Sequence, residues 1–403
     1  MKKRKDKYGR VLKEGEGLRK DGLYQYRYNG IDGKRKTVYA KTLDELREKE
    51  HEIHSDIYNG FCNTDKGITV DQMFARCSAN RQFLKPRSRE VYEYCYNKHA
   101  KPVIGAKKMR DIKYSDMVLY FKYLANEQHL SLSSMRSIYH SLTPLFKMAL
   151  RDGIIKIDPI DGVFAEIRKM YQLTPNKRNA VSQENLNKLA NFIANSRKDS
   201  KYLNIFLILA LTGMRVSELC GLMWQDIDFE NETISVERTV VYLSKENKKI
   251  VQTPKSESGI RQIPMMSKLK EILLEMYENQ KNTPPITCGE YSGFVFGTKT
   301  GAPYVAKDVE DKFRNALKHY NAYETEQAKL ENREPALIEN CCPHSLRHSF
   351  CSLLCENDVN IKTIQEIMGH KNVATTINIY SEVSDTKKRN ELRQLEEKFI
   401  SIN

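Results

Sequence analysis

The sequence of 403 residues contains no run of about 20 apolar residues, which is the length that a membrane-spanning helix requires. Its most apolar segment, residues 203–211 (LNIFLILAL), has the length of a buried helix in a folded domain. The charged start MKKRKDKYGR is not followed by an apolar region, so it lacks the pattern of a secretory signal. We therefore expect an intracellular protein that has no membrane partner.

The nine cysteines lack the regular spacing of a disulfide framework and their number is odd, so we expect reduced thiols. One stretch gathers residue types that bind metals: Cys341, Cys342, His344, His348, Cys351 and Cys355. It contains no CxxC pair and no second pair of ligands at zinc-finger spacing. We predict small buried thiols on a core-facing helix here rather than a metal site.

The chain also lacks the motifs of two large classes of enzyme that act on phosphates. It has no GxxxxGKS loop, the motif with which P-loop proteins hold ATP. It has no aspartate-rich motif of the kind that binds two metal ions in nucleases. We expect no cofactor.

Positive charge, in contrast, is abundant. The formal net charge is +14 and the pI is near 9.1. This favours a polyanionic partner, because lysine and arginine neutralise phosphates and release counterions. Residues 1–41 hold fourteen Lys and Arg against five Asp and Glu, so this end alone carries +9.

Residues 1–60 have the pattern of a small sheet followed by a helix. Tyrosines alternate with polar side chains in residues 23–28, which is typical of a strand, and turn signals separate them from a returning strand at 34–40. A strand before these two would complete a three-stranded sheet, and Thr42–Glu45 is a capping box that opens a helix to about Tyr58. The basic side chains expected to enter a DNA major groove are Arg27, Lys34, Arg35 and Lys36. The alternative is a solvated basic hairpin.

Residues 64–170 are expected to be all helical. The amphipathic segments lie near 70–80, 87–99, 114–126 and 131–151. They predict a four-helix bundle with a basic face, to which Lys85 and Arg87 contribute. Residues 171–180 have the composition of a polar linker.

The remainder combines helices with a β-rich stretch at 232–264. Its charged segment 321–340 is expected to be a surface insertion. The predicted fold class is therefore multi-domain α+β: a small three-stranded sheet with a helix, a helical bundle, and a mixed, mainly helical third domain.

The third domain contains groups that a phosphodiester transfer without metal would need: a nucleophile, cations for the non-bridging oxygens and an acid for the leaving oxygen. In TGMRVSEL, a helix is expected to break at Thr212-Gly213 and a new one to begin beside Arg215, near helix-terminal amides that suit a phosphate. Glu218 could orient this arginine, although such a pair is more often a structural salt bridge. Lys255, at a hairpin between two strands, could donate a proton, although most exposed turn lysines have no such role.

The stretch PHSLRH predicts a helix that begins at Pro343 and carries His344 and Arg347 on one face. A structural histidine is the alternative for His344. The apolar face of this helix would comprise Leu346, Phe350 and Leu353.

Further along, Gly369 is expected to end a helix and to expose His370. A second short helix then carries Tyr380. Nothing physical distinguishes this tyrosine from the other tyrosines of the chain without the flanking pattern.

Taken in order, TGMRVSEL, the hairpin lysine, HSLRH, GH and TTxNIY closely resemble the motifs of the tyrosine recombinase (lambda-integrase-like) family. Each motif is weak evidence alone, but five in the family's order and spacing are unlikely to agree by chance. Residues 1–60 are similar to the arm-binding domain of integrases from Gram-positive conjugative transposons, and 64–170 to the SAM-like core-binding domain. Residues 176–403 are similar to the catalytic domain with its C-terminal exchange helix.

The resemblance implies a metal- and ATP-independent integrase that integrates and excises a mobile element through a 3′-phosphotyrosyl intermediate. The implied catalytic set is Arg215, Lys255, His344, Arg347, His370 and Tyr380, with Glu218 in support. The tyrosine would attack the scissile phosphate, and the lysine would protonate the leaving 5′-oxygen. The arginines would hold the non-bridging oxygens, and the histidines would add hydrogen bonds.

The resemblance also implies partners: double-stranded DNA with core and arm sites, a homotetramer on that DNA, and an excisionase or DNA-bending protein. The implied location is the bacterial cytoplasm, at the nucleoid when bound to DNA. Three alternatives stay open. They are a type IB topoisomerase, a chromosome-dimer resolving recombinase, and a non-catalytic DNA-binding regulator that kept the fold.

Overall fold

The computed structural model describes residues 4–30, 33–58, 67–171, 181–254, 257–339 and 341–382. The chain divides into two compact units, Met1–Pro175 and Asn176–Asn403. Within the described ranges, no helix is both long enough and apolar enough to cross a membrane.

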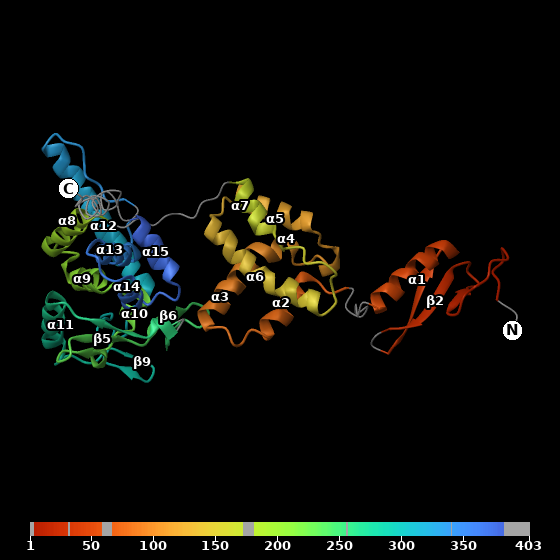
Figure 1. Cartoon of the computed structure of the whole chain (residues 1–403), viewed down its shortest axis with the longest axis horizontal. Helices are drawn as coiled ribbons and strands as arrows, with labels where there is room; N and C mark the ends of the chain where they lie inside the picture. Colours follow the sequence, from red (N-terminus) through yellow and green to blue (C-terminus); the bar gives the residue numbers. More distant parts are fainter. Residues whose placement is uncertain are drawn as a thin grey trace, which may run out of the picture. The chain divides into compact units, whose positions relative to one another are not determined.

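The first unit begins with the predicted three-stranded antiparallel sheet, in the order β1 (Glu16–Leu18), β2 (Tyr24–Asn29) and β3 (Arg35–Ala40). Tyr24 and Tyr26 are buried, whereas Arg27, which follows Tyr26, is exposed, so the predicted alternation is confirmed. Helix α1 (Leu43–Tyr58) covers the buried face, where Leu46 packs with the tyrosines (Figure 1). Arg27 therefore lies on the face that α1 does not cover.

Helix α1 begins where the sequence predicts, directly after Thr42. The Thr42 hydroxyl accepts a hydrogen bond from the backbone N–H of Glu45 at 3.2 Å. The Glu45 carboxylate, however, accepts from the N–H of Lys41 at 3.1 Å and not from that of Thr42. The predicted helix start is confirmed. The predicted hydrogen bond from the N-cap backbone to the Glu45 side chain is wrong by one residue, because the donor is the residue before Thr42.

Residues 67–171 of the first unit form helices joined by turns and loops, with one isolated bridge between Thr69 and Lys108. The α-helices of this range are α2 (Val70–Ala79), α3 (Pro86–Cys95), α4 (Lys101–Ile104), α5 (Tyr114–Asn126), α6 (Leu132–Arg151) and α7 (Val163–Met170). In the core of this bundle, the rings of Phe74 and Tyr96 stack with their centroids 3.6 Å apart. Helix α7 was not predicted, and it packs on α5 through a hydrogen bond from the Tyr114 hydroxyl to Glu166.

The second unit mixes helices with short strands. Its α-helices are α8 (Gln183–Asn195), α9 (Leu203–Thr212), α10 (Val216–Cys220), α11 (Ser267–Gln280), α12 (Ala306–Leu330), α13 (Pro343–Glu356), α14 (Ile361–Met368) and α15 (Val373–Glu382). Its strands are β4 (Ile227–Asp228), β5 (Thr233–Val236), β6 (Thr239–Leu243), β7 (Lys248–Gln252), β8 (Arg261–Pro264), β9 (Thr287–Cys288) and β10 (Tyr291–Ser292). The predicted β-rich stretch is confirmed.

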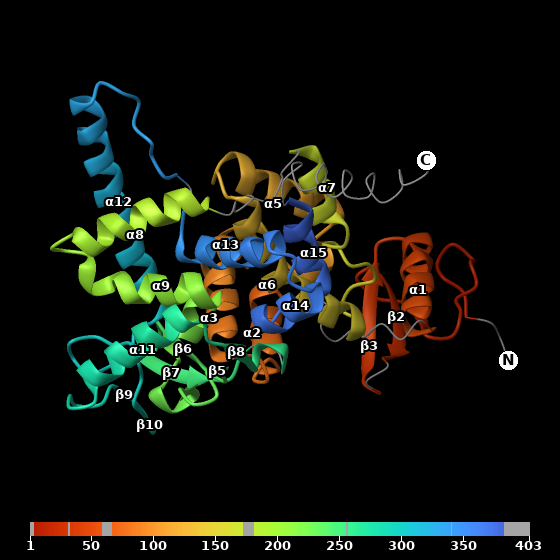
Figure 2. The same cartoon turned by 60° about the vertical axis from the view of Figure 1, so that its left-hand side comes forward.

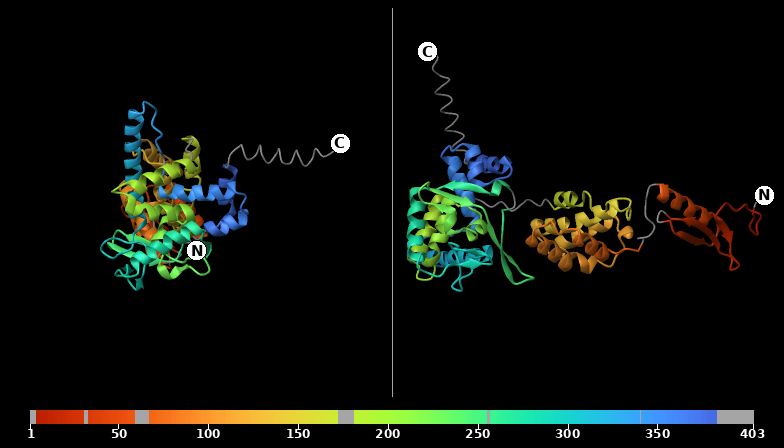
Figure 3. Two further views of the ribbon diagram at one scale, coloured as in Figure 1. Left: turned by 90° about the vertical axis from the view of Figure 1, so that its left-hand side faces the viewer. Right: turned by 90° about the horizontal axis from the view of Figure 1, so that it is seen from below.

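The strands of that stretch belong to two separate sheets. Strands β4, β5 and β8 form one antiparallel sheet, whereas β6 and β7 form a hairpin of their own, seen in green in Figure 3. The predicted hairpin around Lys255 is therefore wrong, because β7 and β8 are not partners. The apolar pattern explains the difference: Ile263 of β8 is buried opposite Ile234 of β5.

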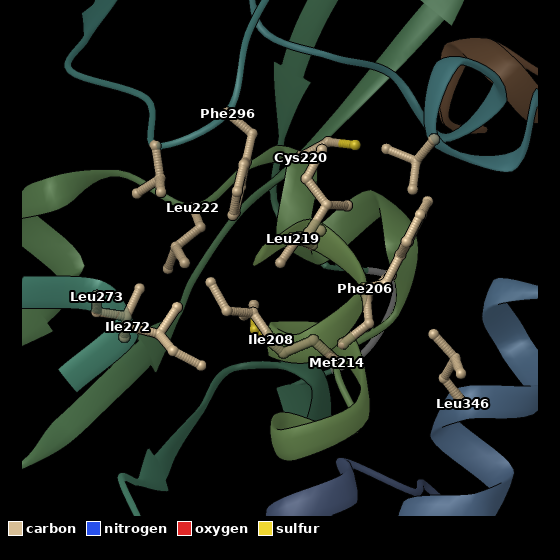
Figure 4. Packing of buried hydrophobic residues seen from close by; sticks show 14 of the residues in the cluster. Phe206, Ile208, Met214, Leu219, Cys220, Leu222, Ile272, Leu273, Phe296 and Leu346 are labelled. Atoms are coloured by element: carbon tan, nitrogen blue, oxygen red, sulfur yellow. The ribbon is translucent and has the colours of Figure 1, made fainter. Parts of the chain in front are cut away.

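The main core of the second unit surrounds helix α9. Phe206 and Ile208 of this helix pack with Leu219 of α10 and Leu273 of α11 (Figure 4). Leu346 of α13 belongs to the same cluster. This core fixes the starts of α10 and α13, whereas Met368 at the end of α14 belongs to a second apolar cluster.

The charged segment 321–340 is not simply an inserted loop. Helix α12 continues through its first half with Glu324 buried, and the end of this helix projects from the unit (Figure 2). The chain then folds back along the helix, where Asn321 donates to the carbonyl of Ile338 and accepts from its N–H, both at 3.0 Å. The surface position agrees with the expectation, but the expected insertion is in part a regular helix.

Candidate active site

Arg215 lies at a sharp break between two helices. Helix α9 ends at Thr212, whose hydroxyl accepts from the N–H of Met214 at 3.3 Å. Gly213 between them has a φ of +61°, and a Cβ there would lie 2.5 Å from a ring carbon of Phe350. Only glycine combines this left-handed backbone with so close an approach. Helix α10 then begins with Arg215 as its N-cap residue, so the predicted break is confirmed.

Glu218 holds the Arg215 side chain from behind. Its carboxylate accepts from Nη1 of Arg215 at 2.6 Å and from the backbone N–H of the same residue at 2.9 Å. Nη2 of Arg215 donates to the carbonyl of Gly369 at 3.1 Å. The Glu218 side chain is 1% exposed and that of Arg215 is 39% exposed. The guanidinium is therefore fixed in orientation and still accessible from outside.

Arg347 lies below the surface on α13, the helix that begins at Pro343 as predicted. Its side chain donates to the carbonyl of Gly213 at 2.6 Å and to that of Met368. Burial, followed by the neighbouring charge of Arg215, lowers the pKa of Arg347 to about 9. An anion entering the site would raise the pKa of Arg347 again, because its negative charge would offset the positive charges of the two arginines.

His344 is half-buried in the first turn of α13, with its ring at right angles to that of His348 and the centroids 5.0 Å apart. It faces a cleft within the second unit. The polar residues lining this cleft are Arg215, Ser217, Glu310, Arg314, Cys342 and His344. Two residues of this set, Glu310 and Arg314, come from α12 and were not predicted. No sequence motif marks them, because they lie on the charged face of a long helix.

His370 follows the end of α14 at Gly369, whose φ of +63° is that of a left-handed cap, as predicted. The expectation that His370 is exposed is wrong, since the residue is 8% exposed. Its Nδ1 lies 2.9 Å from the Thr376 hydroxyl oxygen. Burial, and then the charges of Arg347 and Arg215, lower the pKa of His370 to about 4. The imidazole is thus neutral near pH 7.

The other two members of the predicted catalytic set lie wholly or partly outside the described residues. Lys255 lies between the described segments 181–254 and 257–339. Tyr380 belongs to helix α15, but its side chain is not among those described. The structure therefore brings Arg215, Glu218 and Arg347 together with the His370 turn, and α15 follows that turn directly.

The predicted DNA-binding residues all lie in the first unit. Arg27, Lys34 and Arg35 are exposed on the small sheet or its turn, and Lys36 is half-buried. Lys85 is half-buried at the start of α3, two residues before the exposed Arg87, which pairs with Glu90 at 2.9 Å.

Helix α13 carries two of the four thiols of the cysteine-histidine stretch. Cys351 and Cys355 are completely buried, as predicted for thiols on a core-facing helix, whereas Cys341 and Cys342, just before the helix, are half-buried. Among the described residues, no group of three or more His, Cys, Asp or Glu side chains could hold a metal ion. The predicted apolar face of α13 is shorter than expected, because Leu353 is 40% exposed whereas Leu346 and Phe350 are buried.

Sequence reasoning missed one buried arginine next to this set. Arg261, the first residue of β8, donates through Nη2 to Glu218 at 3.0 Å and through Nε to the carbonyl of Ile367 at 2.5 Å. A signal existed, since strand alternation places Arg261 on the same side as the buried Ile263. A charged residue at an inward strand position indicates a buried partner.

Comparisons with known proteins agree with this geometry. Residues 179–387 match the phage integrase family. Residues 1–57 match the DNA-binding domain of Tn916 integrase, and residues 79–125 match the phage integrase N-terminal SAM-like domain.

Relatives and solved structures of the same kind align with nearly the whole chain. The transposase from transposon Tn916 of Enterococcus faecalis is 29% identical over 98% of this chain and 96% of its own length. The ICEBs1 integrase of Bacillus subtilis is 25% identical over 92% of this chain and 95% of its own. A structure of the Tn1549 transposon integrase, in complex with transposon right end DNA, covers 82% of this chain and 100% of that one, with 27% identity and a TM-score of 0.71. The chain belongs to the phage integrase family and is a tyrosine-type site-specific DNA recombinase.

Proposed function

We propose that the chain integrates and excises a mobile element, with Tyr380 as the nucleophile that cleaves DNA. Tyr380 loses its phenolic proton to water, its oxygen attacks the scissile phosphorus to form a 3′-phosphotyrosyl bond, and the bond from phosphorus to the 5′-oxygen breaks. Lys255 gives its proton to that oxygen, which leaves as a free 5′-hydroxyl. Rejoining reverses these steps with the 5′-hydroxyl of another strand. One phosphodiester is exchanged for another, so bond energy is conserved and no ATP is required. The arginines and histidines take the part that a metal ion plays in other phosphoryl-transfer enzymes, which is to stabilise charge on the phosphate oxygens.

The observation that carries this proposal is the convergence of Arg215 and Arg347 on one turn. They come from different helices, and they donate to the neighbouring carbonyls of Gly369 and Met368. Two guanidiniums so placed suit the two non-bridging oxygens of a phosphate, since arginine binds such oxygens with a planar fork of donors. Glu218 fixes one of them.

The state of the histidines supports the same chemistry. A neutral His370 can donate one hydrogen bond to a phosphate oxygen without adding charge. His344 lines the cleft that Arg215 also lines. Both histidines then stabilise the negative charge that develops on phosphorus oxygens in the transition state.

The division of labour along the chain is proposed as follows. Residues 1–60 bind arm sites, residues 64–170 bind core sites, and residues 176–403 carry the chemistry and an exchange helix. The Tn1549 transposon integrase has been solved with transposon end DNA and with circular intermediate DNA. Double-stranded DNA is the corresponding partner of this chain, bound in the cytoplasm at the nucleoid. Joining two duplexes requires four strand cleavages, hence a homotetramer, assisted by an excisionase or DNA-bending protein.

The test is a covalent adduct with a nicked suicide duplex of core-site DNA in EDTA. The short fragment that carries the free 5′-hydroxyl diffuses away from such a duplex, so rejoining cannot occur. The 3′-phosphotyrosyl adduct therefore accumulates and is seen as a shifted band on a denaturing gel. Tyr380→Phe should abolish the adduct and leave DNA binding intact. Adduct formed by that variant would remove Tyr380 as the nucleophile. Strand exchange between two duplexes would separate recombination from the nicking and closing of a topoisomerase.

A further inference from the structure

Three arginines surround one buried carboxylate in the second unit. Glu218 accepts from Arg215 and from Arg261, and the charges of these two arginines also act on Arg347. Burial raises the pKa of Glu218, but the charge and hydrogen bond of Arg261, followed by those of Arg215, outweigh it and lower the pKa. Glu218 is therefore ionised, and it is shared between an accessible arginine and a buried one.

Arg261 lies too deep to grip a phosphate, and each of its three nitrogens already donates a hydrogen bond inside the unit. Its side chain is 5% exposed. Besides the bond to Glu218, Nε donates to the carbonyl of Ile367 at 2.5 Å and Nη1 to that of Gly259 at 3.2 Å. These contacts join α10, the end of α14 and the turn before β8.

Gly369 lies between the two arginines that share Glu218. A Cβ on Gly369 would lie 3.0 Å from Cδ of Arg261 and 2.7 Å from the carbonyl oxygen of Ser258. On its other side, the Gly369 carbonyl accepts from Arg215 at 3.1 Å. The turn that leads to His370 is therefore held between Arg261 and Arg215.

The net charge of Arg215, Glu218 and Arg261 also assigns a role to Arg261. Arg215 and Glu218 alone would form a neutral pair, and a neutral pair attracts phosphate weakly. With Arg261 bound to the second carboxylate oxygen, the three residues carry one net positive charge in a buried setting. The accessible member, Arg215, then presents that charge outward.

We propose that Arg261 is a positioning residue for strand cleavage: it shares Glu218 with Arg215 and braces the Gly369 turn, and so aims Arg215 at the scissile phosphate. The inference rests on the proposed cleavage reaction. It assigns a role to a residue that does not touch DNA. Loss of Arg261 should therefore slow the chemical step and leave DNA affinity nearly unchanged.

The experiment measures single-turnover adduct formation by the full chain on the suicide duplex. Arg261→Gln should lower the rate by up to about a hundredfold, because Arg261 acts through Arg215 and the loss of a direct transition-state donor costs about that much. Core-site affinity should stay within about threefold of wild type. Arg261→Lys keeps the charge and loses the fork, so it should lose about tenfold or more. Arg215→Lys combined with Arg261→Gln should be about as slow as Arg215→Lys alone, because one residue acts through the other.

A second substrate separates positioning from general damage. A methylphosphonate at the scissile position replaces one charged oxygen with a neutral methyl group, so cleavage depends less on Arg215. The ratio of wild-type to Arg261→Gln rates should shrink on this substrate. Arg238→Gln is the matched control, since the side chain of Arg238 is only 12% exposed and its Nη1 pairs with Asp226 at 2.5 Å in the same unit. The ratio of wild-type to Arg238→Gln rates should be the same on both substrates.

Wild-type rates in both Arg261 variants would overturn the inference. So would rate losses that multiply in the double variant, or an Arg261→Gln defect equal on the two substrates. If Arg261→Gln does not fold, Arg261→Lys is used instead to compare the single-variant rate, the double variant with Arg215→Lys, and the two substrates. A wild-type chain that forms no adduct would instead refute the proposed function.

Discussion

Arg215 and Arg347 donate to the carbonyls of Gly369 and Met368, which are consecutive residues at the end of one helix. Arg347 also donates to the carbonyl of Gly213, at the end of another helix. Two helix C-termini therefore hold the cations, because the carbonyls there carry partial negative charge. A phosphate would compete with these carbonyls and replace weak acceptors with a full negative charge.

Replacing Arg215 with lysine should severely slow strand cleavage. A lysine keeps the charge but lacks the planar fork with which Arg215 binds Glu218 through Nη1 and the Gly369 carbonyl through Nη2. We expect a loss of about 3–4 kcal/mol of transition-state stabilisation, which is a hundredfold or more in rate. Single-turnover cleavage of the suicide duplex measures it, with gel-shift affinity as the control. A rate within about threefold of wild type would show that Arg215 does not bind the scissile phosphate in the transition state.

The break at Arg215 was predictable from sequence because it depends on local chemistry. Thr212-Gly213 after an apolar run indicates a helix end, and the left-handed φ of Gly213 confirms it. The lowered pKa of His370 was not predictable, because it depends on burial and on the charges of Arg347 and Arg215, which come from distant segments. Likewise, nothing local shows that β8 pairs with β5 rather than with β7.

The close packing at Gly213 should make it much less tolerant of alanine than another glycine with the same backbone. Gly213 and Gly289 have φ values of +61° and +62°, but a Cβ meets Phe350 and Met368 at the first and nothing within 4 Å at the second. We expect Gly289→Ala to cost about 1 kcal/mol of unfolding free energy from backbone strain alone. Gly213→Ala should cost about 2–4 kcal/mol, because overpacking adds to the strain.

Tryptophan fluorescence can report both costs. The single tryptophan of the chain is Trp224, which lies in the second unit with both glycines. Urea unfolding followed by its emission therefore measures the stability of this unit within the full chain. Equal midpoints for the two variants would show that the contacts of Gly213 are not limiting.

His370 should remain neutral far below the ordinary pKa of histidine. Its pKa is lowered from 6.5 to about 4, so between these values the unfolded chain binds a proton that the folded chain excludes. The contribution of this residue to stability is therefore complete above about pH 6.5 and is lost as the pH falls towards 4. An NMR titration of the histidine Cε1–Hε1 signals, with His370→Asn to assign the signal, should show no shift above pH 5. A midpoint near 6.5 would contradict the burial of this ring.

The sheet of residues 1–60 should bind a DNA site of its own. Arg27 of β2 and Arg35 of β3 are exposed on two paired antiparallel strands, and the buried tyrosines of β2 face the other side. Footprints of the full chain and of residues 64–403 should differ by the protection of a second, distant site. Arg27→Ala with Arg35→Ala in the full chain should remove that protection and leave the core footprint unchanged. Identical footprints for all forms would reduce the sheet to a general electrostatic arm.

The C-terminal segment, residues 381–403, should act between protomers. Most of it lies outside the described residues, but its sequence places Leu392, Leu395, Phe399 and Ile400 at helical spacing. Such a stripe needs an apolar groove, and the second unit has one. Its apolar lining includes Leu186, Leu207, Ala210, Leu211, Phe350 and Leu353, from α8, α9 and α13.

The stripe could equally fill the groove of its own protomer, and the two cases predict different behaviour. Deleting residues 386–403 should leave core-site binding by one protomer nearly unchanged and prevent assembly of the four-protomer complex on native gels. Leu353→Glu, at an exposed position of the groove, should have the same effect. If the segment acts between protomers, mixing the two defective forms joins an intact segment to an intact groove and restores part of the large complex. A mixture no better than either form alone would place the segment on its own protomer, because neither form then has both halves of the contact.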